Sequence, residues 1–218
     1  MSYRVVRVST RRELIDFVNL PFEIYIEDKN WVAPIKSELL RVLDTKKNPY
    51  FKIASLDLFN CYSGDKIVAR ISLSVNKDFC SKTGIKIGFF GFFESFNDPQ
   101  AVRFLLKVLF NYCSQENIKR IEGPFNPNLY SEIGMLCTNF DFPPSFFQTY
   151  NPDYYNSLLE ENGFKVLELL HTRLNEDSSG YLNKKFSKTL ELQMKDLNVR
   201  SFNDKNSETD LEHLRNIY

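Results

Sequence analysis

The stretch from Gly84 to Phe96, "GIKIGFFGFFESF", constrains the fold of this 218-residue chain more than any other. Its apolar side chains would fall on both faces of an extended strand, whereas a half-exposed strand alternates apolar and polar residues. The stretch is also too short to be a membrane-spanning helix. We therefore expect an interior strand of a sheet that is covered on both faces.

The neighbouring segments predict the rest of that sheet and its helices. The runs "ASLDLFNCY" and "KIVARISLSVN" flank the turn "SGDK", which is typical of an antiparallel hairpin. Asp98 and Pro99 have the pattern of an N-cap and a first helical residue. Further strands are predicted at Tyr3–Ser9, Ile118–Gly123 and Lys165–Asn175. A helix is predicted after Thr10, and Pro21 should end or kink it. Two more helices are predicted at Ser37–Asp44 and at Asp153–Phe164, the latter with a stop at Gly163.

Composition excludes several classes of partner. Lys and Arg balance Asp and Glu at 28 each, so there is no basic excess for a nucleic acid or an anionic membrane surface. The N-terminus has no apolar signal region and no window predicts membrane insertion, which makes the cytoplasm the expected location. The four cysteines are far apart and there are only two histidines, so we expect no metal site.

A long segment from Glu122 to Tyr155, "EGPFNPNLYSEIGMLCTNFDFPPSFFQTYNPDYY", is aromatic and contains no Lys or Arg. It has no helix or strand pattern before its last residues, and loops of this length are usually functional lids or binding loops. Its aromatic side chains would bury enough area to order it, and its Asn-Pro and Pro-Pro pairs would stiffen it. It either walls a ligand pocket or plugs the sheet, and the sequence leaves both readings open.

The C-terminal part predicts a second unit. Residues 1–175 form the first domain in this interpretation, 176–197 a linker helix, and 198–218 the opening strand and helix of another domain that the chain does not complete. A lone strand and part of a helix cannot build a core. The missing C-terminal domain is therefore an expected partner, and an exposed docking edge makes a homodimer possible.

The predicted order of strands and helices resembles the GNAT family, the GCN5-related N-acetyltransferase fold. The closer resemblance is to a bacterial group of uncharacterised tandem GNAT-like proteins. It is carried by "NWVAPIKSE", "KNPYF", "IVARISLSVN", "GFFGFFESFND", "IEGPFNPN", "GMLCTNFDFPPSFFQTYNPDYY" and "ENGF". The resemblance implies an α/β fold of the α+β kind, with a mixed, mostly antiparallel central sheet flanked by helices on both faces.

The resemblance also implies an acyl-CoA site, which the residues support poorly. GNAT enzymes hold the pyrophosphate in a glycine-rich loop after the fourth strand, where backbone N–H groups and a helix dipole favour anions. The corresponding stretch from Glu94 to Gln100 has no glycine, and it carries two carboxylates. If acyl-CoA binds there, the contacting residues would be Phe93, Ser95 and Asn97. The alternative is an ordinary capped helix start.

Candidate catalytic residues follow from the same resemblance. Glu94 ends the very apolar strand and would serve as general base, or it is a solvated charge at a strand end. The usual GNAT tyrosine is replaced by Leu159 in "LEENGF", so Tyr154 or Tyr155, which otherwise only pack, would be the acid. The expected substrate pocket comprises Arg70, Asn126, Asn128, Tyr130, Phe147, Tyr150 and His171, although a core histidine and a sheet-surface salt bridge remain alternatives for His171 and Arg70.

Two functions stay open at this point. In the first, the chain contributes an aromatic substrate pocket to an N-acyltransferase that uses acyl-CoA or a similar donor and a small-molecule amine. In the second, it is a non-catalytic GNAT-like module for ligand binding or scaffolding.

Overall fold

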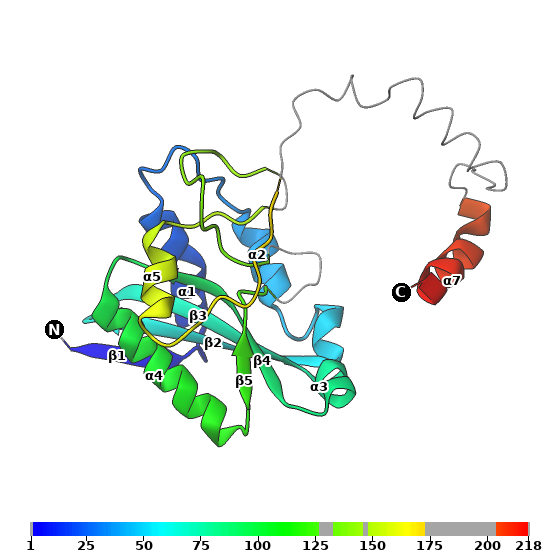
Figure 1. Ribbon diagram of the computed structural model, residues 1–218, viewed down its shortest axis with the longest axis horizontal. Helices are drawn as coiled ribbons and strands as arrows, with labels where there is room; N and C mark the ends of the chain where they lie inside the picture. Colours follow the sequence, from blue (N-terminus) through cyan, green and yellow to red (C-terminus); the bar gives the residue numbers. More distant parts are fainter. Residues whose placement is uncertain (1, 127–132, 146–147, 173–203, 218) are drawn as a thin grey trace. The chain divides into compact units, whose positions relative to one another are not determined.

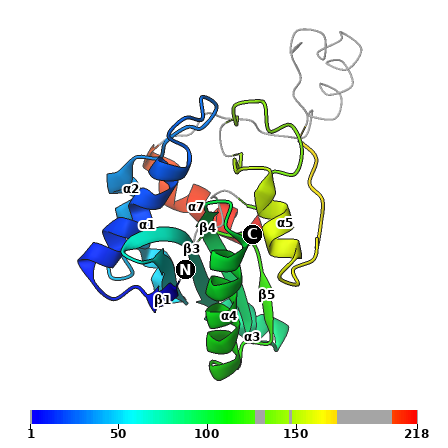
Figure 2. The same ribbon diagram turned by 90° about the vertical axis from the view of Figure 1, so that its left-hand side faces the viewer.

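The computed structural model describes residues 2–126, 133–145, 148–172 and 204–217. The chain divides into two compact units, Met1–Val166 and Leu167–Tyr218. The first unit is a single sheet with helices on both faces (Figures 1 and 2). No helix in the described part of the chain is both long and apolar enough to cross a membrane.

The sheet of the first unit has five strands in the order β1-β2-β3-β4-β5. Their bounds are β1 Tyr3–Arg7, β2 Ala54–Ser63, β3 Lys66–Asn76, β4 Ile87–Ser95 and β5 Arg120–Glu122. Neighbouring strands from β1 to β4 run antiparallel, and β5 runs parallel to β4. The predicted mixed, mostly antiparallel sheet of an α/β fold is confirmed, and the apolar stretch is the interior strand β4.

Helices cover the two faces in pairs. The bounds are α1 Arg11–Ile24, α2 Lys36–Leu43, the 3₁₀ helix η1 Pro49–Lys52, α3 Lys77–Thr83, α4 Pro99–Gln115 and α5 Tyr154–Glu160. Figure 2 shows α1 and α2 on one side of the sheet and α4 and α5 on the other. The predicted caps are present, since Thr10 and Glu13 form a reciprocal capping box and Asp98 accepts hydrogen bonds from the first turn of α4.

The sequence predicted that α1 ends or kinks at Pro21, and the structure excludes the first of these outcomes. The helix continues to Ile24, and the carbonyl of Pro21 still accepts the N–H of Tyr25. Proline removes one helical hydrogen bond, but Leu20 and Pro21 are both buried against the sheet. Tertiary packing thus overrides the local preference and carries the chain one turn further, to Tyr25.

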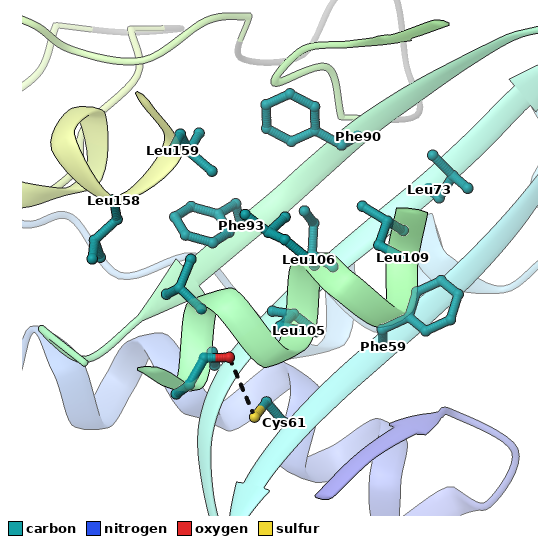
Figure 3. Packing of buried hydrophobic residues seen from close by; sticks show 14 of the residues in the cluster. Phe59, Cys61, Leu73, Phe90, Phe93, Leu105, Leu106, Leu109, Leu158 and Leu159 are labelled. Carbon is teal, nitrogen blue, oxygen red and sulfur yellow. Dashed lines mark hydrogen bonds between the residues drawn. The ribbon is translucent and has the colours of Figure 1, made fainter. Parts of the chain in front are cut away.

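The apolar core lies on both faces of the sheet. On the α4 side, Phe90 and Phe93 of β4 pack with Leu105 and Leu106 of α4 and with Leu158 of α5 (Figure 3). On the α1 side, the packing cluster is Phe17, Val18, Leu43 and Leu58. A strand covered in this way has to be apolar on both faces, which explains the composition of β4.

A bulge interrupts the pairing of β3 and β4. The register shifts between Arg70 and Ser72, and Phe92 has a positive φ of 46°. A bulge bends its strand and re-aims the side chains that follow it. Beyond this one, Glu94 lies directly opposite Arg70 in the ladder.

One predicted strand is absent from the described residues, and one helix was not predicted. The strand predicted at Lys165–Asn175 does not form over Lys165–Thr172, the part that the structure describes, and its apolar side chains there are exposed. A short apolar run has no secondary structure of its own without a paired backbone. Helix α3, whose first turn is capped by Asn76, is the helix that was not predicted.

The second unit contributes the 3₁₀ helix η2 Asp204–Asn206 and helix α7 Ser207–Ile217. Helix α7 falls where the sequence predicts a helix at the opening of a second domain. The predicted linker helix, residues 176–197, lies outside the described residues. The domain boundaries at 175 and 198 therefore remain predictions.

Candidate functional site

The site begins with a carboxylate at the end of the interior strand. The side chain of Glu94 is 15% exposed, and its Oε1 lies 3.7 Å from Nη2 of Arg70 on the adjacent strand. Such a position is unusual, because a charge at a mostly buried strand end loses hydration unless polar partners replace it. The partners around Glu94 therefore define the site.

Two tyrosines from opposite faces of the sheet donate to the same oxygen of Glu94. The hydroxyl of Tyr155, on α5, lies 2.7 Å from Glu94 Oε2, and the hydroxyl of Tyr25, just after α1, lies 3.0 Å from it. Tyr155 also accepts the backbone N–H of Ser95 at 2.8 Å. The carboxylate is thus held in place by groups far apart in sequence.

Burial keeps these phenols protonated. It raises the pKa of Tyr25 and of Tyr155 well above the ordinary value, and the nearby charge of Glu94 adds to both shifts. Tyr154, whose hydroxyl donates to the Ser95 carbonyl at 2.9 Å, has its pKa raised to about 12, again mainly by burial. The cluster therefore offers hydrogen-bond donors around one carboxylate over the neutral pH range.

Arg70 supplies the positive charge. It is 3% exposed and donates from Nη1 to the carbonyl of Phe17 on α1. Its guanidinium lies 4.6 Å from the centre of the Phe17 ring and 5.9 Å from that of Phe92. Burial lowers the pKa of Arg70, and the charge of Glu94 opposes that shift. Its Nε is buried without a hydrogen-bond partner in the described part of the chain.

The segment after β5 attaches to β4 beside this cluster. The N–H of Phe125 donates to the Phe90 carbonyl at 2.7 Å, and the N–H of Phe92 donates to Asn126 Oδ1 at 2.9 Å. The approach is close enough that a Cβ on Gly91 would lie 2.3 Å from the Phe125 carbonyl oxygen. The segment after β5 therefore covers the edge of β4 that β5 leaves unpaired, just before Glu94.

The start of α4 is capped by its own carboxylate. Asp98 Oδ1 accepts the N–H groups of Gln100 and Ala101 at 3.1 and 3.0 Å, and its Oδ2 accepts the hydroxyl of Tyr3. These are backbone donors that an anion would need, and a carboxylate already holds them. Pro99 contributes no donor. The geometry matches the capped helix start that the sequence analysis kept as the alternative.

The aromatic segment from Glu122 to Tyr155 packs on the connection between α1 and α2, in the parts that the structure describes. The hydroxyl of Tyr150 donates to Asp28 Oδ2 at 2.7 Å, and Asn30 Nδ2 donates to the Asp141 carbonyl at 3.0 Å. The ring of Tyr150 lies 6.1 Å from that of Tyr25. This segment therefore covers the Tyr25 side of the site, although these contacts do not decide between pocket wall and plug.

The structure brings together part of the predicted residue set. Arg70, Glu94 and Tyr155 are in direct contact, and Tyr154 and Asn126 flank them. Phe93 is buried in the core, Ser95 is buried among backbone hydrogen bonds, and Asn97 is exposed, so their assignment to a cofactor stays a prediction. His171 is exposed and belongs to the second unit, so its assignment to the pocket stays a prediction. Asn128, Tyr130 and Phe147 lie outside the described residues.

Sequence reasoning missed Tyr25 and Trp31. Their rings stack at 4.8 Å with an interplanar angle of 13°. Tyr25 follows the last turn of a helix that was expected to end or kink at Pro21, which hid its position. The signal in the sequence was the spacing of Tyr25 from Phe17 and Leu20, which are both fully buried. In a helix that continues past Pro21, this spacing turns Tyr25 towards the sheet.

Comparison with known proteins gives the following matches. No family model matches the sequence. The chain is 30% identical over 174 residues to a bacterial ceramide synthase from Caulobacter vibrioides, covering 79% of this chain and 45% of that protein. It is 24% identical over 209 residues to protein YghO of Escherichia coli, covering 95% and 53% respectively. The chain thus spans about half the length of the curated relatives it matches.

The fold is also similar to that of solved acetyltransferases. One is a predicted acetyltransferase with acetyl-CoA from Clostridium acetobutylicum, with a TM-score of 0.49, 14% identity, and coverage of 81% of this chain and 99% of the other.

Proposed function

We propose that this chain is part of an N-acyltransferase that joins an acyl group from a thioester to the amine of a long-chain acceptor. The observation that carries the proposal is the Glu94 carboxylate, held by Tyr25, Tyr155 and Arg70 at the end of the interior strand. The GNAT-like fold and the similarity to a ceramide synthase support it. A ceramide is the amide of a long-chain amino alcohol, which suggests this acceptor class.

In the proposed reaction, Glu94 Oε1 accepts a proton from the acceptor ammonium, because Oε2 already accepts from two tyrosines. The free amine then attacks the thioester carbonyl, so that a C–N bond forms and the C–S bond breaks. The attacking nitrogen loses a second proton as it becomes the amide nitrogen, and the departing thiolate takes up that proton to leave as a thiol. Tyr25 and Tyr155 are positioning residues in this scheme, because their hydroxyl groups fix the direction of the carboxylate rather than contact the substrate.

The acyl donor does not bind at the start of α4 in this proposal. That position is occupied by the Asp98 cap, and Glu94 and Asp98 would repel a pyrophosphate. We propose that acyl-CoA, or a similar thioester, is held by the half of the longer relatives that this chain does not span. The division of labour would place the acceptor on this chain and the donor on the other half.

The second candidate function is a non-catalytic GNAT-like module. It is favoured by one specific observation, that Asn126 already satisfies the Phe92 N–H beside Glu94. A domain whose strand edge is filled by its own side chains would bind or scaffold without turning over a substrate.

The test is acyl transfer to a long-chain amino alcohol, followed by mass spectrometry of the amide, in the full-length protein. Glu94→Gln keeps the size of the side chain and its capacity to accept the tyrosine hydrogen bonds. We expect it to lower kcat by about 100-fold or more, which is the range of general base catalysis. The matched control is Glu122→Gln on β5, a carboxylate with a 13% exposed side chain that lies on the neighbouring strand.

Equal turnover in Glu94→Gln and in the unmodified protein would contradict the assignment and favour the module. Thermal unfolding with added CoA tests the donor site separately, because a ligand that binds the folded state raises the midpoint. We expect no shift for the 218-residue chain. A shift there would show that this chain itself binds the nucleotide and would contradict the proposed division between acceptor and donor halves.

A further inference from the structure

Exposed apolar side chains gather on two segments beside the site. They are Ile26, Val32 and Ile35 on the connection between α1 and α2, and Phe142 on the aromatic segment, with 80%, 68%, 69% and 67% of their surface exposed. Single exposed apolar residues are normal in proteins, but four of this size on adjoining segments mark an interaction surface. We refer to these four residues as the apolar rim.

The two segments of the apolar rim are fastened to each other. The hydrogen bond from Asn30 to the Asp141 carbonyl and the one from Tyr150 to Asp28 cross from one segment to the other. In Figures 1 and 2 both segments lie at the end of the first unit that is opposite α3. The rim is thus one surface formed by two parts of the chain.

An aromatic path leads from the apolar rim to the candidate catalytic group. Trp31 directly precedes Val32 of the rim in the chain, its ring stacks on that of Tyr25, and it also meets the ring of Phe22 edge-on at 5.2 Å. Tyr25 in turn donates to Glu94. An apolar molecule that contacts the rim would therefore be adjacent to the tyrosine that positions the carboxylate.

We propose that the apolar rim enters the interfacial layer of a lipid bilayer and there meets the long-chain acceptor. This inference rests on the proposed function, because a long-chain amine resides in bilayers rather than in water. Tryptophan and tyrosine with neighbouring aliphatic side chains are the residues that favour this layer. The connection between α1 and α2 carries Glu27 and Asp28 against Lys29, and the aromatic segment has acidic residues but no Lys or Arg. There is thus no basic excess to attract anionic lipid, so a neutral phosphatidylcholine surface suffices and anionic lipid adds little.

The chain contains a natural probe for this proposal, because Trp31 is its only tryptophan. The experiment adds phosphatidylcholine vesicles with brominated acyl chains to the 218-residue protein and measures tryptophan fluorescence. Bromine quenches only fluorophores that lie at the depth of the acyl chains. We expect quenching that saturates with lipid, and nearly the same binding curve when part of the lipid is anionic.

Variants of the rim make the test specific. Val32→Asp and Phe142→Asp should each weaken vesicle binding by about tenfold, since interfacial affinity follows the apolar area that is inserted. The matched control is Ile85→Asp, which places the same charge on an exposed isoleucine next to α3, at the other end of the unit. It should bind as the unmodified protein does. Circular dichroism checks that each variant is folded.

Absence of quenching at saturating lipid would overturn the proposal. So would equal loss in the Ile85 control, or binding that requires anionic lipid. Rim-dependent self-association without vesicle binding would also overturn it and identify a protein interface. None of these measurements uses turnover, so the two proposals fail separately. If vesicles do not bind but Glu94→Gln lowers turnover, the proposed function stands. If vesicles bind but Glu94→Gln leaves turnover unchanged, the rim is a lipid-binding surface without the proposed catalysis.

Discussion

The hydroxyl of Tyr155 links the Glu94 side chain to the backbone of the next residue, since it donates to Glu94 Oε2 at 2.7 Å and accepts from Ser95 N at 2.8 Å. One side chain from α5 thereby fixes both the direction of the carboxylate and the path of β4 beyond its bulge. Tyr155 is only 1% exposed, so water cannot replace either hydrogen bond.

Removal of that hydroxyl should be costly. Tyr155→Phe leaves the buried Ser95 N–H without an acceptor, and an unsatisfied buried donor costs about 1–3 kcal/mol. We expect denaturant unfolding to show a loss in that range. The control is Tyr112→Phe, which removes a hydroxyl that donates to Asp57 and should cost less, because Tyr112 is more exposed. Equal losses in the two variants would mean that the Tyr155 hydroxyl has no special role.

The ion pair between Arg70 and Glu94 should show strong coupling. Arg70→Met leaves the carboxylate without its cation. Breaking a fully buried pair lowers the free energy of unfolding by about 3–5 kcal/mol, and we expect a smaller loss here because Glu94 is partly exposed to water. Glu94→Gln in the Arg70→Met background should recover part of the loss, because the unpaired charge is gone. A double-mutant cycle by urea unfolding measures the coupling. Strict additivity would show that the 3.7 Å contact is energetically silent.

The sequence predicted the framework better than the site. The interior strand, the hairpin and the caps at Thr10 and Asp98 follow from local rules that tertiary packing did not overturn. Arg70 and Glu94 were also among the residues singled out from the sequence, since a charge inside an apolar strand pattern is conspicuous, and their functional roles stay predictions.

The partners of Glu94 were harder to predict. Tyr25 reaches it only because α1 continues past Pro21, and Asn126 reaches Phe92 only because the aromatic segment follows β4 after β5. Both contacts depend on the path of the backbone after a position where regular structure was expected to end, Pro21 in one case and the end of β5 in the other. Local periodicity carries no information about such long-range placement, which is also why the strand after Lys165 was wrongly predicted.

The close approach of the aromatic segment to β4 depends on Gly91. Gly91→Ala would place a Cβ 2.3 Å from a backbone oxygen of Phe125, so the segment has to move away. We expect faster hydrogen exchange of the Phe92 N–H and a loss of about 1–3 kcal/mol in unfolding free energy. The matched control is Gly88→Ala on the same strand, where the nearest atoms belong to the side chains of Leu73 and Ile118, which can shift. Protection of Phe92 that survives in Gly91→Ala would contradict the argument.

Alkaline pH should destabilise the fold through the buried tyrosines. Tyr25, Tyr154 and Tyr155 have pKa values raised above the ordinary 10.0, to about 12 for Tyr154, chiefly because burial disfavours the phenolate. Above pH 10.0 the unfolded chain loses these protons while the folded chain retains them. The unfolded state then binds fewer protons, so the free energy of unfolding falls as pH rises towards 12, whereas below pH 10.0 this contribution is constant.

The measurement is the urea midpoint as a function of pH, with tyrosinate absorbance followed in parallel. Lysines and other tyrosines titrate in the same range, so the comparison is made with the Tyr25→Phe, Tyr155→Phe double variant. It is less stable at neutral pH, but it should lose less stability per pH unit above pH 10.0, because two of the groups that drive the change are gone. Identical slopes for the two proteins would place the alkaline transition elsewhere and show that these phenols ionise without unfolding the site.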